Sequence, residues 1–133
     1  MKILIVDDLL ENRKLMLNLL AGYGECDVVA SGQEALDLFE ASILDAAQYD
    51  VVLLDIMMPV MDGHEVLRSM RAQEAEHGLA GENESAIIMV TAAASPRHVL
   101  DAFFKGGCTD YIEKPVSLDT LLGKFRECRL LED

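Results

Sequence analysis

The chain has 133 residues, of which 51% are hydrophobic, so it is long enough for one domain with a single core. Its 11 basic and 24 acidic residues give a formal net charge of −13, which argues against direct binding to nucleic acid or to an anionic membrane surface. Three widely spaced cysteines and the lack of a long apolar stretch predict neither a disulfide framework, a zinc site nor a membrane span, so we expect a cytoplasmic protein.

The predicted elements alternate along the chain between short apolar runs and segments with helical periodicity. Strands are predicted, in order, at residues 2–6, 26–30, 51–54, 86–90 and 109–113. Helices are predicted at about residues 9–21, from Ser31 toward Gln48, and at 63–74, 96–105 and 118–130. Nearly continuous apolar strands separated by amphipathic helices are typical of a parallel sheet covered on both faces. The sequence therefore predicts an α/β, doubly wound fold.

Three of the predicted helices begin with capping residues. Ser31 and Glu34 have the spacing of a capping box, Ser117 can cap the last helix, and Ser95 is followed by Pro96 at the first helical position. These local signals agree with the periodicity.

Polar residues follow four of the predicted strands at their carboxyl ends, where ligands bind in this class of fold. Asp7 and Asp8 follow the first strand, Asp55 the third, Thr91 the fourth and Lys114 the fifth. Converging carboxylates repel one another by roughly 4 kcal/mol per close pair at an effective dielectric constant near 20, so they need a cation. Carboxylate oxygens in small number suit Mg²⁺, which couples carboxylates to phosphate oxygens. The sequence predicts a metal and phosphate site at this edge.

The residues at this edge also resemble a known family. The pair Asp7–Asp8, the run LLDIMMPVMDG around Asp55, the VTA around Thr91 and the YIEKP around Lys114 are similar to the motifs of the receiver domain of two-component response regulators. The resemblance covers essentially the whole chain. It implies a flavodoxin-like (βα)5 fold with the strand order 2-1-3-4-5. It also implies that an aspartate accepts a phosphoryl group from the phosphohistidine of a sensor histidine kinase or of a phosphotransfer protein.

The resemblance assigns a nucleophile and a set of metal ligands. Asp55 resembles the phosphoacceptor, whose carboxylate attacks phosphorus. Asp8 and Asp55, with the backbone carbonyl of Met57, resemble the direct Mg²⁺ ligands, and Asp7 resembles a ligand that acts through water. The only enzymatic activity this implies is self-phosphorylation and auto-dephosphorylation.

The resemblance also assigns residues that respond to the phosphoryl group. Thr91 resembles the hydroxyl that binds a phosphoryl oxygen, and Lys114 resembles the cation that pairs with it. Tyr111, three residues before the lysine, matches the position of an aromatic switch residue. The implied output is a changed face formed by the fourth helix, fifth strand and fifth helix, which binds a downstream target or output domain or forms a phosphorylation-dependent homodimer.

Each of these residues also has a purely structural interpretation. Asp7–Asp8 is also suited to capping the first helix, and Lys114 to being a solvated lysine before a turn. Thr91 is compatible with a strand-end cap, and Tyr111 with ordinary half-buried packing.

Two features depart from the expected pattern. Residues 71–85 are longer than a loop of about 4 to 6 residues, and their polarity predicts a solvated helix extension followed by a turn. Met57 and Ala93, two residues after Asp55 and Thr91, are apolar and cannot orient a water, which predicts a slow to moderate loss of phosphate.

We expect residues 1–133 to form a single receiver domain with no output domain in the chain, either acting alone or cut from a larger protein. One alternative is a small Mg²⁺-dependent phosphohydrolase with an aspartyl-phosphate intermediate, although no cap insertion is evident and Asp7–Asp8 lacks the DxD spacing. Another is an interaction module that does not depend on phosphorylation.

Overall fold

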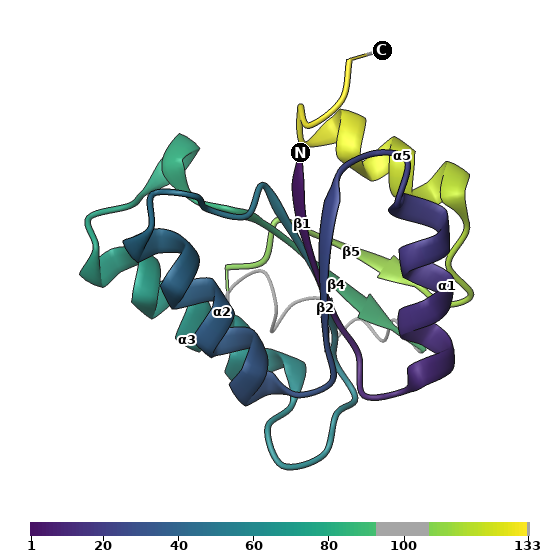
Figure 1. Cartoon of the computed structure of the whole chain (residues 1–133), viewed down its shortest axis with the longest axis horizontal. Coiled ribbons are helices and arrows are strands. Elements are labelled where there is room, and N and C mark those ends of the chain that lie inside the picture. The colour runs from purple at the N-terminus through teal and green to yellow at the C-terminus, as the bar shows by residue number, and fades with distance from the viewer. Residues whose placement is uncertain (93–106, 133) are drawn as a thin grey trace.

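The computed structural model describes residues 1–92 and 107–132, which form a parallel sheet with helices on both faces (Figure 1). The five strands are β1 (Lys2–Val6), β2 (Glu25–Val29), β3 (Val51–Asp55), β4 (Ala86–Thr91) and β5 (Asp110–Glu113). The described helices are α1 (Leu10–Leu20), α2 (Gly32–Leu44), α3 (Gly63–Glu76) and α5 (Leu118–Glu127), with a 3₁₀ turn at Gly81–Asn83. The strand order is β2-β1-β3-β4-β5, so the doubly wound fold and its predicted strand order are confirmed.

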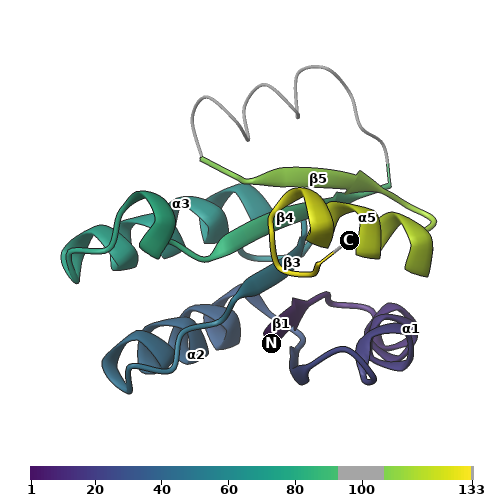
Figure 2. The ribbon, with the colours of Figure 1, turned by 90° about the horizontal axis from the view of Figure 1, so that it is seen from above.

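The sheet separates two apolar layers (Figure 2). Helices α2 and α3 cover one face, where Leu4 and Leu54 pack with Phe39, and α1 and α5 cover the other, where Ile5 and Leu53 belong to the second core cluster. Successive residues of a strand point to opposite faces, so β1 and β3 are apolar at nearly every position. The continuous apolar runs of these central strands follow from their burial on both sides.

The helix ends differ in places from the sequence prediction. Helix α2 ends at Leu44, well before Gln48, and α5 ends at Glu127 rather than at residue 130. Ala46 and Arg129 adopt positive φ angles of 54° and 62°, which turn the backbone out of the helix. Neither position is a glycine, so the sequence carried no signal for these ends. The helix predicted at 96–105, which begins at Pro96, lies outside the described residues, and so do Ala93 and Ser95 before it.

Local interactions fix the starts of the helices next to the sheet. The hydroxyls of Ser31 and Ser117 each accept a hydrogen bond from a backbone N–H three residues later, both at 3.2 Å, as predicted. The Asp62 carboxylate accepts from the Glu65 N–H at 3.0 Å and starts α3. A Cβ at Gly63 would collide with the backbone of Asp55 and Ile56. Glycine therefore lets α3 begin directly against the end of β3.

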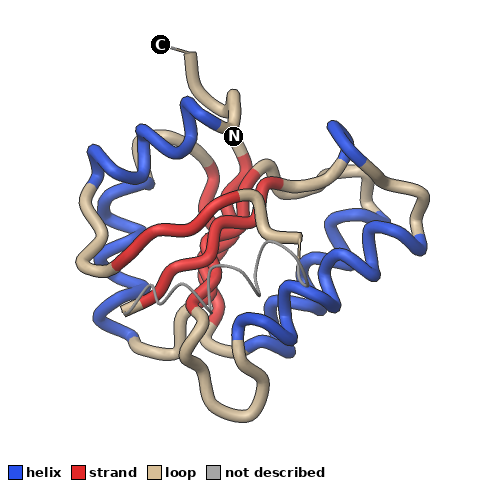
Figure 3. Tube along the Cα trace, turned by 180° about the vertical axis from the view of Figure 1, so that it is seen from behind, coloured by secondary structure: helices blue, strands red, loops and turns tan. Residues whose placement is uncertain are grey.

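The carboxyl ends of the strands lie along one edge of the sheet, where the loops to the helices begin (Figure 3). Within the described ranges, no helix is both long enough and apolar enough to cross a membrane.

Candidate functional site

Three carboxylates meet where β1 and β3 end side by side. Val6 pairs with Leu54 in the sheet, so Asp7 and Asp8 after β1 lie next to Asp55 at the end of β3. One oxygen from each of the three carboxylates lies within 4.8 Å of the others. Asp7 and Asp55 are only 5% and 3% exposed, and Asp8 is half-buried. The structure therefore brings the predicted acidic residues together in a setting where their charge is poorly solvated.

Lys114 supplies a cation to this carboxylate cluster. Its Nζ lies 3.3 Å from Asp7 Oδ2 and 3.5 Å from Asp55 Oδ1. Its backbone N–H donates to the Thr91 carbonyl at 2.7 Å, and the peptide bond to Pro115 is cis. Lys114 is thus an ion-pair partner of both buried carboxylates and not a solvated lysine.

Asp55 carries the clearest electrostatic perturbation at the site. Burial, and then the negative charge of Asp7, raise the pKa of Asp55 to about 6, although Lys114 and the Met57 N–H at 3.3 Å oppose the rise. The single lysine therefore does not offset the combined effect of burial and the neighbouring carboxylate on Asp55. This environment favours the binding of a further cation.

Asp7 also organises the start of α1. Its Oδ1 accepts hydrogen bonds from the Leu9 N–H at 2.9 Å and from the Asn12 side chain at 3.5 Å, while Arg13 donates to the Asp7 carbonyl at 2.9 Å. Leu9, at the N-cap position, provides no side-chain cap. Asp7 therefore serves both the helix and the carboxylate cluster. The sequence analysis missed Asn12 and Arg13, which the first turn of α1 directs back toward Asp7.

The other predicted residues lie on neighbouring elements. Thr91 is buried at the end of β4, beside Glu113 of β5. Tyr111 is half-buried within β5, opposite Met89, and its ring centroid is 6.0 Å from the Lys124 Nζ. The structure thus places Tyr111 on the strand that leads to Lys114. The side chain of Met57 is exposed, and its N–H faces Asp55.

A cavity of about 320 Å³ opens beside the carboxylates. It reaches Asp55 and Lys114 and continues between α1 and the segment after β5, where Leu15, Met16 and Val116 line it. The site is accessible to a small molecule or to a side chain of a partner.

Comparisons with known proteins agree with this geometry. The family model described as response regulator receiver domain matches residues 3–126. The chain is 34% identical over 128 residues to the two-component response regulator ORR41 of Oryza sativa, covering 94% of each chain. It is 33% identical over 117 residues to hybrid signal transduction histidine kinase I of Dictyostelium discoideum, covering 87% of this chain but only 6% of that protein.

Two solved structures have the same fold over nearly their whole length. The receiver domain of the Arabidopsis thaliana histidine kinase CKI1, solved with Mg²⁺ and BeF₃⁻, has 26% identity and a TM-score of 0.82, covering 98% of this chain and 90% of that chain. The second structure is a co-crystal of the Saccharomyces cerevisiae phosphotransfer protein Ypd1 and the receiver domain of its downstream response regulator Ssk1. A chain of that structure matches with 26% identity and a TM-score of 0.83, covering 100% of this chain and 93% of that chain.

Proposed function

We propose a function from one premise: this chain belongs to the response regulator receiver domain family of two-component systems. Its proposed reaction is transfer of a phosphoryl group to Asp55 from the phosphohistidine of a sensor histidine kinase or a phosphotransfer protein. The observation that carries the proposal is the position of Asp55, buried at the end of β3 with Asp7, Asp8 and Lys114 around it. Residues 1–133 would act in the cytoplasm as one receiver domain, alone or within a longer protein.

The reaction is a displacement at phosphorus. A carboxylate oxygen of Asp55 forms a bond to phosphorus, while the bond from phosphorus to the donor imidazole breaks and the imidazole keeps the electron pair. Lys114, 3.5 Å from Asp55 Oδ1, is placed to neutralise negative charge on the phosphoryl oxygens. The Thr91 hydroxyl, at the end of the next strand, would donate a hydrogen bond to one of these oxygens.

The residues present fit Mg²⁺. They offer a small set of oxygen ligands from three close carboxylates, and burial, together with the charge of Asp7, raises the pKa of Asp55. Asp8, Asp55 and the Met57 backbone carbonyl would hold the ion directly, and Asp7 would hold it through water. When bound, Mg²⁺ would balance charge on the transferring group and orient it. The related CKI1 receiver was solved with Mg²⁺ and BeF₃⁻.

The proposed output is a shift between two conformations. A phosphoryl group on Asp55 would draw Thr91 and Lys114 toward it, and Tyr111 on β5 would change its packing in response. The affected surface would include β5 and α5 and would bind a downstream target, an output domain or a second copy of the chain.

Phosphoramidate and millimolar Mg²⁺ provide the direct test of the acceptor. The wild-type chain should gain one base-labile phosphoryl group, detected by intact-protein mass spectrometry, and Asp55→Asn should gain none. Asp37→Asn, an exposed carboxylate on α2, is the matched control and should react like the wild type. Unchanged labelling of Asp55→Asn would mean that the acceptor is another residue.

NMR spectroscopy tests the output. Beryllofluoride should shift signals of β5 and α5 in the wild type, and Thr91→Ala should still bind beryllofluoride but show a smaller response at Tyr111. Lys114→Ala should accept phosphate more slowly and transmit little of the change. Shifts restricted to the neighbourhood of Asp55 would instead support a phosphate sink.

A further inference from the structure

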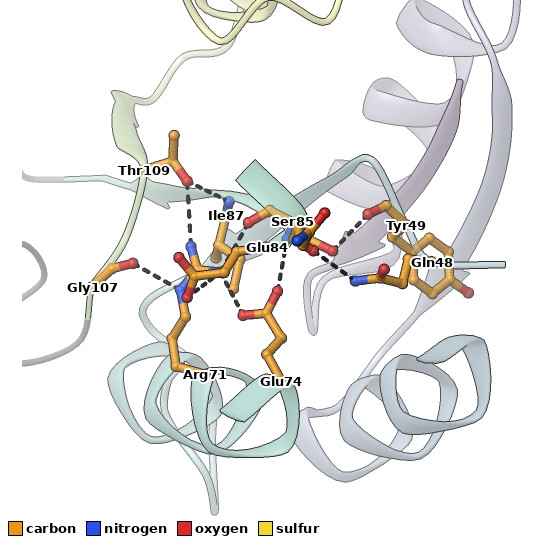
Figure 4. Close-up of polar contacts among 10 residues, drawn as sticks. Gln48, Tyr49, Arg71, Glu74, Glu84, Ser85, Ile87, Gly107 and Thr109 are labelled. Carbon is orange, nitrogen blue, oxygen red and sulfur yellow. Dashed lines mark hydrogen bonds and ion pairs between the residues drawn. The ribbon is translucent and has the colours of Figure 1, made fainter. Parts of the chain in front are cut away.

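Most residues of the segment 71–85 are exposed, as its polarity predicts, and α3 runs on to Glu76, but two polar residues of the segment are buried. Glu74 is fully buried on α3, and Ser85, just before β4, is 4% exposed. Both belong to a polar cluster around Arg71 (Figure 4). Replacing a buried ion pair with apolar residues is often neutral or stabilising, so such a pair is weak evidence of a role in stability alone. The contacts of the cluster show which parts of the chain it holds together.

Arg71 joins α3 to two separate segments of the chain. Its Nη1 donates to Glu74 Oε1 at 2.6 Å and to the Ser85 carbonyl at 2.9 Å, on the path into β4. Its Nε donates to the Gly107 carbonyl at 2.9 Å, and its Nη2 lies 3.4 Å from Thr109 Oγ1, on the path into β5. The planar guanidinium has donors in fixed directions, so it holds both segments at once.

Further hydrogen bonds connect the residues around Arg71 to one another. Glu74 Oε2 accepts from the Ser85 N–H at 2.7 Å, so both Glu74 oxygens are bound. Thr109 exchanges two bonds with Ile87: its N–H donates to the Ile87 carbonyl at 2.8 Å, and its Oγ1 accepts from the Ile87 N–H at 2.9 Å. Gly107 has a φ of +74°, which a side chain would disfavour at this turn. The alignment of β5 on β4 is thereby set at its first residues.

This alignment determines where Lys114 lies. Strand β5 has only four residues, is the outermost strand of the sheet and pairs with β4 alone. Lys114 follows Thr109 by five residues, about 16 Å along an extended chain. A slip of one residue along β4 would move Lys114 by about 3.3 Å and reverse the faces of the β5 side chains. The contacts of Lys114 with Asp7 and Asp55, at 3.3 and 3.5 Å, would not survive such a shift.

We propose that Arg71 is a positioning residue for Lys114: it fixes the alignment of β5 at the amino edge of the sheet so that Lys114 reaches the carboxylates at the opposite edge. The effect on phosphorylation rests on the function proposed above, whereas the effect on strand alignment does not.

The first arm of the test uses metal-free protein without a phosphoryl donor. In Arg71→Met, NMR should show broadened or doubled signals and faster amide exchange at the β4–β5 pairs, such as Met89 with Tyr111, while β1–β3 pairs stay unchanged. Phe39→Leu, a core change on α2, is the control for general loss of stability and should leave β5 unaffected. Wild-type spectra for β5 in Arg71→Met would overturn the proposal.

The second arm is a double-mutant cycle on the rate of phosphorylation by phosphoramidate. Arg71→Met should slow the reaction roughly 3- to 10-fold when Lys114 is present and have almost no effect in Lys114→Ala. Arg71→Lys keeps the positive charge but loses the planar set of guanidinium donors, so its rate of phosphorylation should lie between those of the wild type and Arg71→Met. Equal slowing with and without Lys114 would contradict positioning through Lys114. Absence of any reaction in the wild type would refute the proposed function, and the first arm would still decide the alignment.

Discussion

Asp55 is buried beside a second carboxylate, so its protonated form is favoured more in the folded protein without metal than in the unfolded chain. With its pKa raised to about 6 from an ordinary 3.8, this group stabilises the fold most below about pH 4, and the contribution is lost as the pH rises through about 6. The full effect is on the order of 3 kcal/mol. Asp55→Asn stays neutral and should therefore be about 1 to 3 kcal/mol more stable than the wild type near pH 7.5 in EDTA.

Urea unfolding at two pH values measures this difference. The advantage of Asp55→Asn should nearly vanish at about pH 4, where the wild-type carboxyl is protonated in the fold. Asp37→Asn, exposed on α2, should show no comparable pH dependence. An Asn variant that is less stable than the wild type at pH 7.5 would show that Lys114 overcompensates the burial of Asp55.

Val60 adopts a conformation that its side chain disfavours. It has a φ of 69° in the loop after Asp55, and its side chain is fully exposed, so no packing offsets the strain. Asparagine tolerates this left-handed region, so Val60→Asn should stabilise the protein by about 1 kcal/mol. Val60→Thr remains β-branched and serves as the matched control, with stability near that of the wild type. Thermal unfolding compares the three proteins, and a less stable Asn variant would refute the strain argument.

At the scale of elements, two glycines have opposite roles. Gly63 begins α3 where a Cβ would meet the backbone of Asp55 and Ile56, whereas Gly123 lies inside α5 with open space around the position of a Cβ. Gly63→Ala should destabilise the protein by about 1 to 3 kcal/mol. Gly123→Ala should stabilise it by about 0.5 to 1 kcal/mol, because alanine loses less entropy in a helix. Chemical denaturation of both variants tests the contrast, and equal effects of the two changes would contradict it.

Elements and site differ in how far the sequence predicts them. The apolar runs placed β1 at its observed residues, and the order of polar residues at strand ends brought Asp7, Asp8, Asp55 and Lys114 to one edge. The ends of α2 and α5 were missed because they depend on left-handed alanine and arginine residues.

The Arg71 cluster was missed because its partners are distant in sequence, at Ser85, Gly107 and Thr109. One local signal was available. Glu74 follows Val66 and Met70 at intervals of four on the buried face of α3, and Arg71 precedes it by three. An acid on an apolar helix face with a nearby arginine indicates a buried pair.

At the scale of the whole molecule, the net charge of −13 means that acidic side chains repel one another in the folded state. Salt should therefore stabilise the protein by screening this repulsion. Mg²⁺ should stabilise the protein more than Na⁺ does at equal ionic strength, because the proposed site would also bind Mg²⁺ in the folded state. At a free Mg²⁺ concentration ten times the dissociation constant, binding would add about 1.4 kcal/mol to the free energy of unfolding. Asp8→Ala should lose this extra stabilisation and keep the screening effect. Melting curves in NaCl and MgCl₂ separate the two, and identical curves for the wild type would argue against a specific site.

Both ends of the described chain lie at the amino edge of the sheet, away from the carboxylates (Figure 1). The backbone N–H of Lys2 donates to the Asp50 carboxylate at 2.7 Å, and Leu130 lines the same surface hollow as Asp50 and Ala86. A fluorophore, an affinity tag or a tether to a sensor surface attached at either end would therefore lie away from the carboxylate cluster and the cavity beside it. Under the proposed function, immobilised protein should bind a phosphotransfer partner as readily as free protein does, so it would serve to screen candidate kinases in parallel.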